Sequence, residues 1–208
     1  GLVFAEPLMP SLSRRGRELA DSPPLPEYIA EHFARAGEPW HADENPDGYV
    51  GMCLAENKLL NAQLAAQLAQ YSPAAKALGY DAMIGNLEFR KQLARFMGRT
   101  FLGREFSPAD LAVLAGAGSV LELLFHAICD AGDAVLVPTP SYAGFWADLE
   151  TRDELRIVTV DCASADDFRL TSDALDAAFA RAEHPVRALL FTTPNNPLGR
   201  VYSREEIL

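Results

Sequence analysis

The sequence has few cysteines and no clustering of histidine or cysteine that is typical of a metal site. Its three cysteines, Cys53, Cys129 and Cys162, show no Cys-x-x-Cys spacing. An odd and sparse count of this kind favours reduced thiols in a cytoplasmic setting. The four histidines are equally scattered, and no two are spaced as ligands on one helix face. We therefore expect a cytoplasmic protein without a metal site.

Long apolar runs and basic patches are also missing. No apolar run approaches the roughly 20 residues of a membrane-spanning helix, and residues 1–7 are too short and too acidic for a signal peptide. Lysine and arginine number 18 against 29 acidic residues, so the formal net charge is −11. A nucleic-acid-binding protein would carry a basic patch. We expect partners that are neither membranes nor nucleic acids.

What the sequence does contain is a regular alternation of two patterns from residue 111 onward. Short apolar runs predict strands, and stretches of helical spacing predict helices between them. The strands are expected at 111–115, 134–137, 155–160 and 186–191, and the helices at 118–129, 142–151 and 172–182. This alternation is typical of βαβ units. The predicted fold class is α/β, with a mainly parallel central sheet and flanking helices.

The residues before 111 follow a less regular pattern. Residues 1–26 form a proline-dotted arm, in which we expect little core. Helices are expected at 27–36, 59–71 and 87–97, with Asn86 as the N-cap of the third, and a short strand at 49–54. At the other end, Ser203-Arg204-Glu205-Glu206 has the spacing of a capping box. The helix that it starts has barely begun at Leu208, so we expect a truncated chain.

Three segments that follow predicted strands carry groups able to bind one ligand. The glycine-rich turn 115–119 opens a helix, whose free amides and positive dipole attract an anion such as phosphate. Tyr142 follows the strand at 134–137 and can lie against a planar ring. The rigid turn 192–199 follows the last strand and offers an asparagine amide. Since parallel strands end at one edge of a sheet, the three groups are expected in one pocket.

Each of these segments also has an ordinary explanation. The glycine turn is equally consistent with tight packing, Tyr142 with a half-buried core residue, and 192–199 with a plain strand-to-helix loop. A dinucleotide-binding turn is a further alternative. It requires a third glycine, where this chain has Leu121, and an acid at the end of the next strand, which instead ends in Val137-Pro138. A nucleotide-binding domain is therefore disfavoured.

Taken in order, several motifs resemble class I/II pyridoxal-phosphate (PLP) aminotransferases of fold type I. They are Tyr80-x4-Gly85, the turn 115–119, Asp130-Ala131-Gly132-Asp133, Pro140-Ser141-Tyr142 and Asn195-Asn196-Pro197-Leu198-Gly199. Within that family, residues 51–59 and 88–97 are similar to the aminocyclopropane-carboxylate-synthase-like branch. The resemblance covers about residues 49–208 and matches the N-terminal half of the family. It implies that 1–58 are an arm with part of a small domain, and 59–208 half of the large cofactor-binding domain.

The resemblance assigns roles to individual residues. Ala117, Gly118 and Ser119 would hold the phosphate of pyridoxal 5'-phosphate. Tyr142 would stack on its pyridine ring, and Asn196 would hydrogen-bond the 3-hydroxyl oxygen of that ring. The family often has threonine where this chain has Gly118, which leaves one phosphate-binding hydroxyl fewer.

Other implied roles concern the substrate and a second subunit. Tyr80 would reach the phosphate of the neighbouring subunit, which implies a homodimer with shared active sites. Ala55 and Glu56 would lie near the amino-acid substrate, with the Ala55 backbone close to its carboxylate. Synthase-like members have a tyrosine two residues before the glycine that Gly85 matches. Met83 stands there, which argues against cyclopropane-forming specificity.

The family also requires a lysine that forms the Schiff base with the cofactor. The only lysines, Lys58, Lys76 and Lys91, precede the pocket-forming strands, whereas the family's lysine follows the Asn-Pro-x-Gly turn. We therefore expect this chain alone to be inactive. The whole enzyme is expected to act on an α-amino acid through an external aldimine, by transamination or by β/γ-elimination, as a C–S lyase or synthase-like enzyme. The alternative is a noncatalytic scaffold domain that dimerises in a larger assembly.

Overall fold

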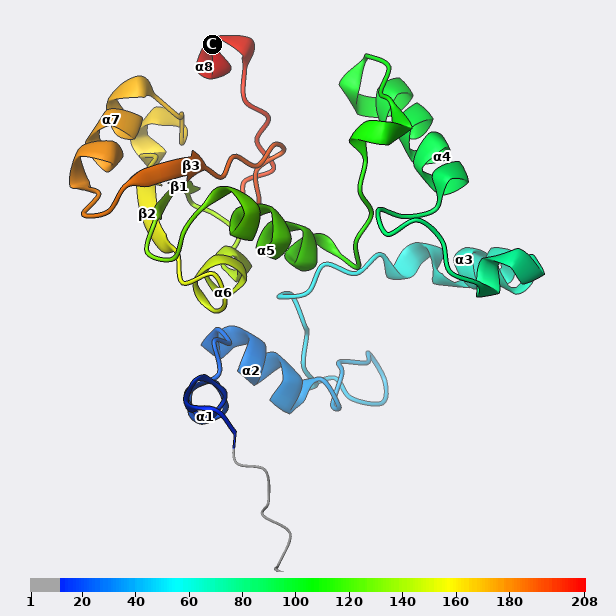
Figure 1. Ribbon diagram of the computed structural model, residues 1–208. Coiled ribbons are helices and arrows are strands. Elements are labelled where there is room, and N and C mark those ends of the chain that lie inside the picture. The colour runs from blue at the N-terminus through cyan, green and yellow to red at the C-terminus, as the bar shows by residue number, and fades with distance from the viewer. Residues whose placement is uncertain (1–11) are drawn as a thin grey trace, which may run out of the picture.

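The computed structural model describes residues 12–208, whose regular elements are shown in Figure 1. In chain order they are α1 (Arg14–Asp21), α2 (Glu27–Arg35), α3 (Asn61–Ala69), α4 (Leu87–Met97), α5 (Ala117–Ile128), β1 (Ala134–Thr139), α6 (Gly144–Glu150), β2 (Arg156–Asp161), α7 (Ser172–Arg181), β3 (Val186–Leu189) and α8 (Arg204–Ile207). Short 3-10 and π-helical turns complete the list, one of which extends α4 to Leu102.

The centre of the fold is a parallel sheet with strand order β2-β1-β3. Strand β1 lies in the middle, and its residues Ala134 to Val137 are buried on both faces of the sheet. A continuous apolar run of this kind is typical of a strand covered by helices on two sides. The α/β fold with a parallel sheet is therefore confirmed.

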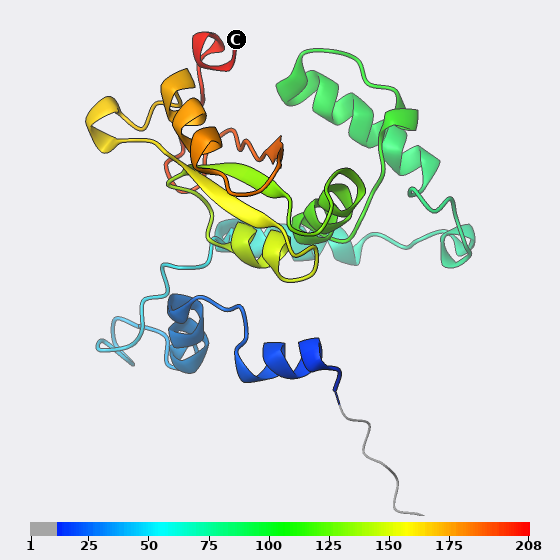
Figure 2. The ribbon, with the colours of Figure 1, turned by 60° about the vertical axis from the view of Figure 1, so that its left-hand side comes forward.

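Side chains that alternate along β1 divide the core into two clusters. Val135 and Val137 pack with Phe125 of α5 and Leu149 of α6. Leu136 points to the other face, where it packs with residues of β2 and α7, including Val160 and Ala178. Accordingly, α6 and α7 lie on opposite sides of the sheet (Figure 2). The result is a three-layer arrangement that holds the ends of β1 and β3 in place.

Two expected strands do not form in the described chain. The segment 111–115 is not a strand: Val113 donates its amide to the Ile84 carbonyl at 3.0 Å, but no neighbouring strand extends this contact. A strand needs a partner for its ladder of hydrogen bonds. The segment 49–54 is also irregular, with only one bridge, between Pro39 and Tyr49. Both predictions were wrong because an apolar run alone does not supply a partner.

The helices before the sheet carry apolar side chains that the described residues do not cover. No residue of α1, α2 or α3 is buried. In the helix expected at 59–71, the apolar side chains spaced along one face are all exposed, namely Leu60, Leu64, Leu68 and Tyr71. In Figure 1, α3 and α4 extend away from the sheet, and α1 and α2 lie below it. The arm contains α1, a helix that the proline pattern did not predict.

Helix ends follow the predicted capping chemistry. The Asn86 side chain accepts a hydrogen bond from the Phe89 amide at the start of α4, as predicted. At the start of α7, the Thr171 side chain accepts one from the Ala174 amide. At α8 the two reciprocal bonds of a capping box are present between Ser203 and Glu206. Of the helices in residues 12–208, none is both long enough and apolar enough to cross a membrane.

Candidate functional site

A cavity of about 790 Å³ lies beside the carboxyl ends of β1 and β3. Its walls come from four parts of the chain: the end of the arm with the start of α2 (residues 24–29), the segment 52–55, the start of α6 with the residues before it, and the turn at 196–197. Three residues singled out by the sequence, Ala55, Tyr142 and Asn196, line this cavity. Tyr142 and Asn196 line the same cavity because each follows a strand, and the two strands are neighbours in the sheet.

Tyr142 presents a half-exposed ring to this cavity. Its ring packs against that of Phe145 in a T-shaped arrangement, with centroids 5.3 Å apart and an angle of 86° between the ring planes. Gly144 leaves room for this position, because a side chain there would overlap the Tyr142 ring. Phe145 is buried in the core cluster, so the core holds one side of the Tyr142 ring while the rest of the ring stays exposed.

The turn at 195–200 is held by Asn195, a residue whose role the sequence did not reveal. Asn195 is buried, and its Nδ2 donates a hydrogen bond to the Pro140 carbonyl at 3.2 Å. Its Oδ1 accepts one from the Leu198 amide at 3.1 Å. The side chain therefore ties the turn after β3 to the turn after β1. The only signal in the sequence is the pair of adjacent asparagines before Pro197, of which one can support the turn while the other lines the cavity.

Replacing Asn195 with alanine is expected to lower the free energy of unfolding by about 1–3 kcal/mol, because Pro140 and Leu198 would lose their buried partner. Urea denaturation followed by circular dichroism measures this loss. Asn61→Ala, at an exposed position of α3, is the control and is expected to have little effect. Equal stabilities for Asn195→Ala and the unchanged protein would contradict the bridging role.

The glycine-rich turn opens α5. Gly116 is the N-cap residue with φ +87°, a conformation that glycine adopts without strain. Within residues 12–208, no hydrogen bond joins the amides of Ala117, Gly118 or Ser119 to an acceptor, as expected for the first turn of a helix. The Ser119 hydroxyl lies 2.9 Å from the Ala115 carbonyl and 3.0 Å from that of Gly116, and donates its one proton there. This turn therefore has donors free for an anion.

The glycine-rich turn does not itself line the cavity. The link between them is Asp148 of α6, which lines the cavity and faces Gly118. Because the segment 111–115 does not join the sheet, the turn after it is not fixed at the same edge as Tyr142 and Asn196. The structure thus places two of the three predicted groups together and the third beside them.

Two further residues singled out by the sequence lie outside the cavity. Tyr80 is fully exposed, and Glu56 pairs with Lys58 at 3.1 Å on the surface. Lys91 likewise pairs with Glu88, at 2.7 Å. No lysine is found among the residues that line the cavity.

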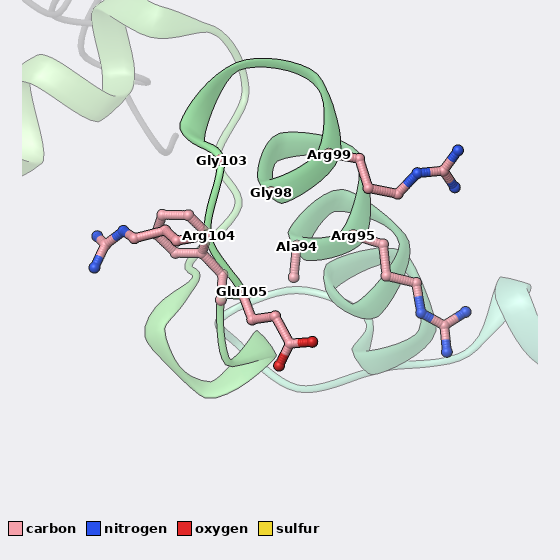
Figure 3. Close-up of a pocket in the computed structure, with 8 residues that line it drawn as sticks. Ala94, Arg95, Gly98, Arg99, Gly103, Arg104 and Glu105 are labelled. Atoms are coloured by element: carbon pink, nitrogen blue, oxygen red, sulfur yellow. The ribbon is translucent and has the colours of Figure 1, made fainter.

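A separate cavity of about 590 Å³ lies between α4 and the segment 103–106 (Figure 3). The side chains of Arg95 and Arg99 extend from α4 away from the segment 103–106, and Arg104 lies over the Phe106 ring. The three arginines do not converge on a common point, and none of the predicted site residues lines this cavity.

Comparison with known proteins assigns the chain to a family. Residues 50–208 match the family described as aminotransferase class I and II. The chain belongs to this family. A 1-aminocyclopropane-1-carboxylate synthase 5 from Oryza sativa subsp. japonica is 37% identical over 213 residues, which cover 94% of this chain and 40% of the relative. A Glycine max 1-aminocyclopropane-1-carboxylate synthase is also 37% identical, over 185 residues.

Solved aminotransferase structures share the fold. An aminotransferase from Eubacterium rectale superimposes with a TM-score of 0.58 at 26% identity and covers all of this chain and 49% of its own. Aspartate aminotransferase from Thermus thermophilus with maleate gives a TM-score of 0.63 at 24% identity, covering 96% of this chain and 49% of its own. The chain therefore spans two fifths to one half of the length of these relatives.

The cofactor of class I and II aminotransferases is pyridoxal 5'-phosphate, and the groups of this site fit it. The first turn of α5 supplies unpaired amides for a phosphate, Tyr142 a half-exposed ring for a pyridine, and Asn196 an amide on the cavity wall. The cavity volume of about 790 Å³ is within the usual range for small-molecule sites.

Proposed function

We propose that this chain supplies much of the cofactor site of a PLP-dependent enzyme that acts on an α-amino acid. The observation that carries the proposal is that Tyr142, Asn196 and Ala55 line one cavity, which lies beside the free amides of α5. When bound, the cofactor supplies an electron sink for a carbanion at the amino acid's Cα. The residues of this chain hold, orient and tune it.

Each residue then has one task in the proposed site. The amides of Ala117, Gly118 and Ser119 bind the phosphate, which the positive end of α5 also attracts. The Ser119 hydroxyl joins them by turning its proton from the Ala115 and Gly116 carbonyls to the phosphate. The Tyr142 ring stacks on the pyridine, which contributes of the order of 1 kcal/mol beyond burial. Asn196 donates a hydrogen bond to the 3-hydroxyl oxygen and so favours its ionised form.

The substrate side of the proposed site is formed by Ala55 and the residues next to it. Ala55 lies on the cavity wall, and its backbone is proposed to bind the substrate carboxylate. Glu56 follows it just outside the cavity lining, where it pairs with Lys58, and in the proposed site it leaves this surface pair to act near the substrate side chain. Neither residue supplies the base that removes the Cα proton, so a lysine from outside the cavity lining is required.

A homodimer is part of the proposal. Tyr80 is fully exposed, and the apolar side chains of α3, such as Leu64 and Leu68, have no cover among residues 12–208. In the dimer, Tyr80 reaches the phosphate of the partner subunit. Apolar burial at this face is the driving force for association.

Incubating the complete polypeptide with PLP and a panel of α-amino acids tests the proposal. We expect a cofactor absorption band that shifts when the right amino acid is added. A matching 2-oxo acid, formed only with an amino acceptor, would identify transamination, and ammonia with a released side-chain group would identify elimination. No band in a protein that still dimerises would contradict the enzyme and favour a noncatalytic scaffold.

A further inference from the structure

Asp148 is the side chain that connects the cavity with the first turn of α5. It lines the cavity together with Tyr142 and Asn196. A methyl group added at Gly118 would lie 3.2 Å from its Oδ1, so the carboxyl group rests against that turn. Glycine at 118 therefore leaves the space that the Asp148 carboxyl occupies. A phosphate bound to the amides of α5 would lie beside this carboxyl group.

The Asp148 carboxyl has no partner among residues 12–208, neither a hydrogen-bond donor nor a cation. Of the charged groups on the two helices around it, Glu122 of α5 pairs with Arg152 just after α6. Glu150 accepts a hydrogen bond from Ile157, and His126 pairs with Asp153. The titratable groups across the cavity, Tyr28, Cys53 and Tyr142, carry no positive charge. Burial without a counter-ion raises the pKa of the Asp148 carboxyl above its ordinary value.

An ionised carboxylate next to a phosphate dianion is unfavourable, whereas a protonated carboxyl can donate a hydrogen bond to it. We propose that Asp148 is a positioning residue that takes up a proton when the cofactor phosphate binds and then donates a hydrogen bond to that phosphate. This inference rests on the proposed function, since it takes PLP as the ligand. Protonation of Asp148 would make the affinity of the site for the phosphate group depend on pH, while the affinity for the pyridine ring would not.

The sign of the pH dependence follows from the charges. Above the pKa of Asp148 the carboxylate repels the phosphate, so affinity falls as the pH rises. The phosphate monoester has its own second pKa near 6 and is a dianion at pH 8. The pyridine nitrogen of PLP also titrates, so the test compares the unchanged protein with Asp148→Asn at each pH, and the difference between the two reports on Asp148.

Calorimetric titration of the complete polypeptide with PLP, in buffers of different ionisation enthalpy, measures both affinity and proton uptake. We expect the unchanged protein to take up more protons on binding PLP than Asp148→Asn, which is neutral and can donate a hydrogen bond without titrating. Above the pKa of Asp148, Asp148→Asn is expected to bind PLP about tenfold more tightly, which corresponds to one pKa unit of coupling between the carboxyl proton and the phosphate. Asp176→Asn, at an exposed position of α7, is the matched control and should behave like the unchanged protein.

Pyridoxal, which lacks the phosphate, is the second probe. It should bind the unchanged protein and Asp148→Asn equally. If PLP binds and its proton uptake and affinity are the same in Asp148→Asn, the role of Asp148 is wrong while the proposed function stands. If PLP does not bind the unchanged protein, both are wrong. An equal gain in affinity for pyridoxal would also overturn the phosphate role.

Discussion

Replacing Asn196 with alanine in the complete polypeptide weakens the binding of PLP by roughly 10- to 150-fold. The proposed hydrogen bond joins the Asn196 amide to an oxygen that carries negative charge, and such a bond contributes about 1.5–3 kcal/mol, which corresponds to this range of affinity. Asn196 is the one asparagine among the residues that line the cavity. No other side-chain amide of this turn can therefore donate a hydrogen bond to the ring oxygen in its place. Fluorescence titration with PLP measures the change.

A ligand lacking the 3-hydroxyl group provides the matched control for Asn196. The 3-deoxy analogue of PLP should bind the unchanged protein and Asn196→Ala with the same affinity, since the bond in question is missing in both. Should Asn196→Ala weaken the analogue as much as PLP itself, the effect would come from a disturbed turn and not from a contact with the ring oxygen.

Replacing Leu149 with alanine lowers the free energy of unfolding by about 2–5 kcal/mol, the usual cost of emptying a fully buried leucine site. Leu149 has no exposed surface and packs with Phe125, Val135 and Leu155 between the sheet and α6. Because α6 follows Tyr142 and carries Asp148, this layer also fixes one wall of the cavity. Urea denaturation of the complete polypeptide, followed by circular dichroism, measures the loss.

The control for Leu149 is Leu123→Ala in α5, which removes the same atoms from a side chain that is 51% exposed. We expect a loss below about 1 kcal/mol, because little buried contact disappears. Equal losses for the two variants would contradict the packing described for α6 and β1.

The sheet and the meeting of Tyr142 with Asn196 were predictable from the sequence. The apolar runs at 134–137 and 186–191 are long enough to mark buried strands, and parallel strands bring their carboxyl ends to one edge. Once β1 and β3 are neighbours, the residues that follow them must lie close together. Local capping chemistry, as at Thr171, was predictable for the same reason: it depends on residues a few positions apart.

Features that depend on distant partners were not predictable. The run at 111–115 reads as a strand, but only a neighbouring strand could make it one, and residues 12–208 supply none. For this reason the glycine-rich turn lies beside the cavity and not on it. The bridge from Asn195 to Pro140 and the contact between Asp148 and Gly118 join residues 55 and 30 positions apart, which no local pattern reveals.

A crystal structure of the complete polypeptide with PLP tests the central claim most directly. It should show the phosphate within hydrogen-bonding distance of the amides of Ala117 to Ser119, the ring against Tyr142 and the 3-hydroxyl oxygen at the Asn196 amide. A cofactor bound anywhere else, or a bound phosphate that the first turn of α5 does not touch, would contradict it.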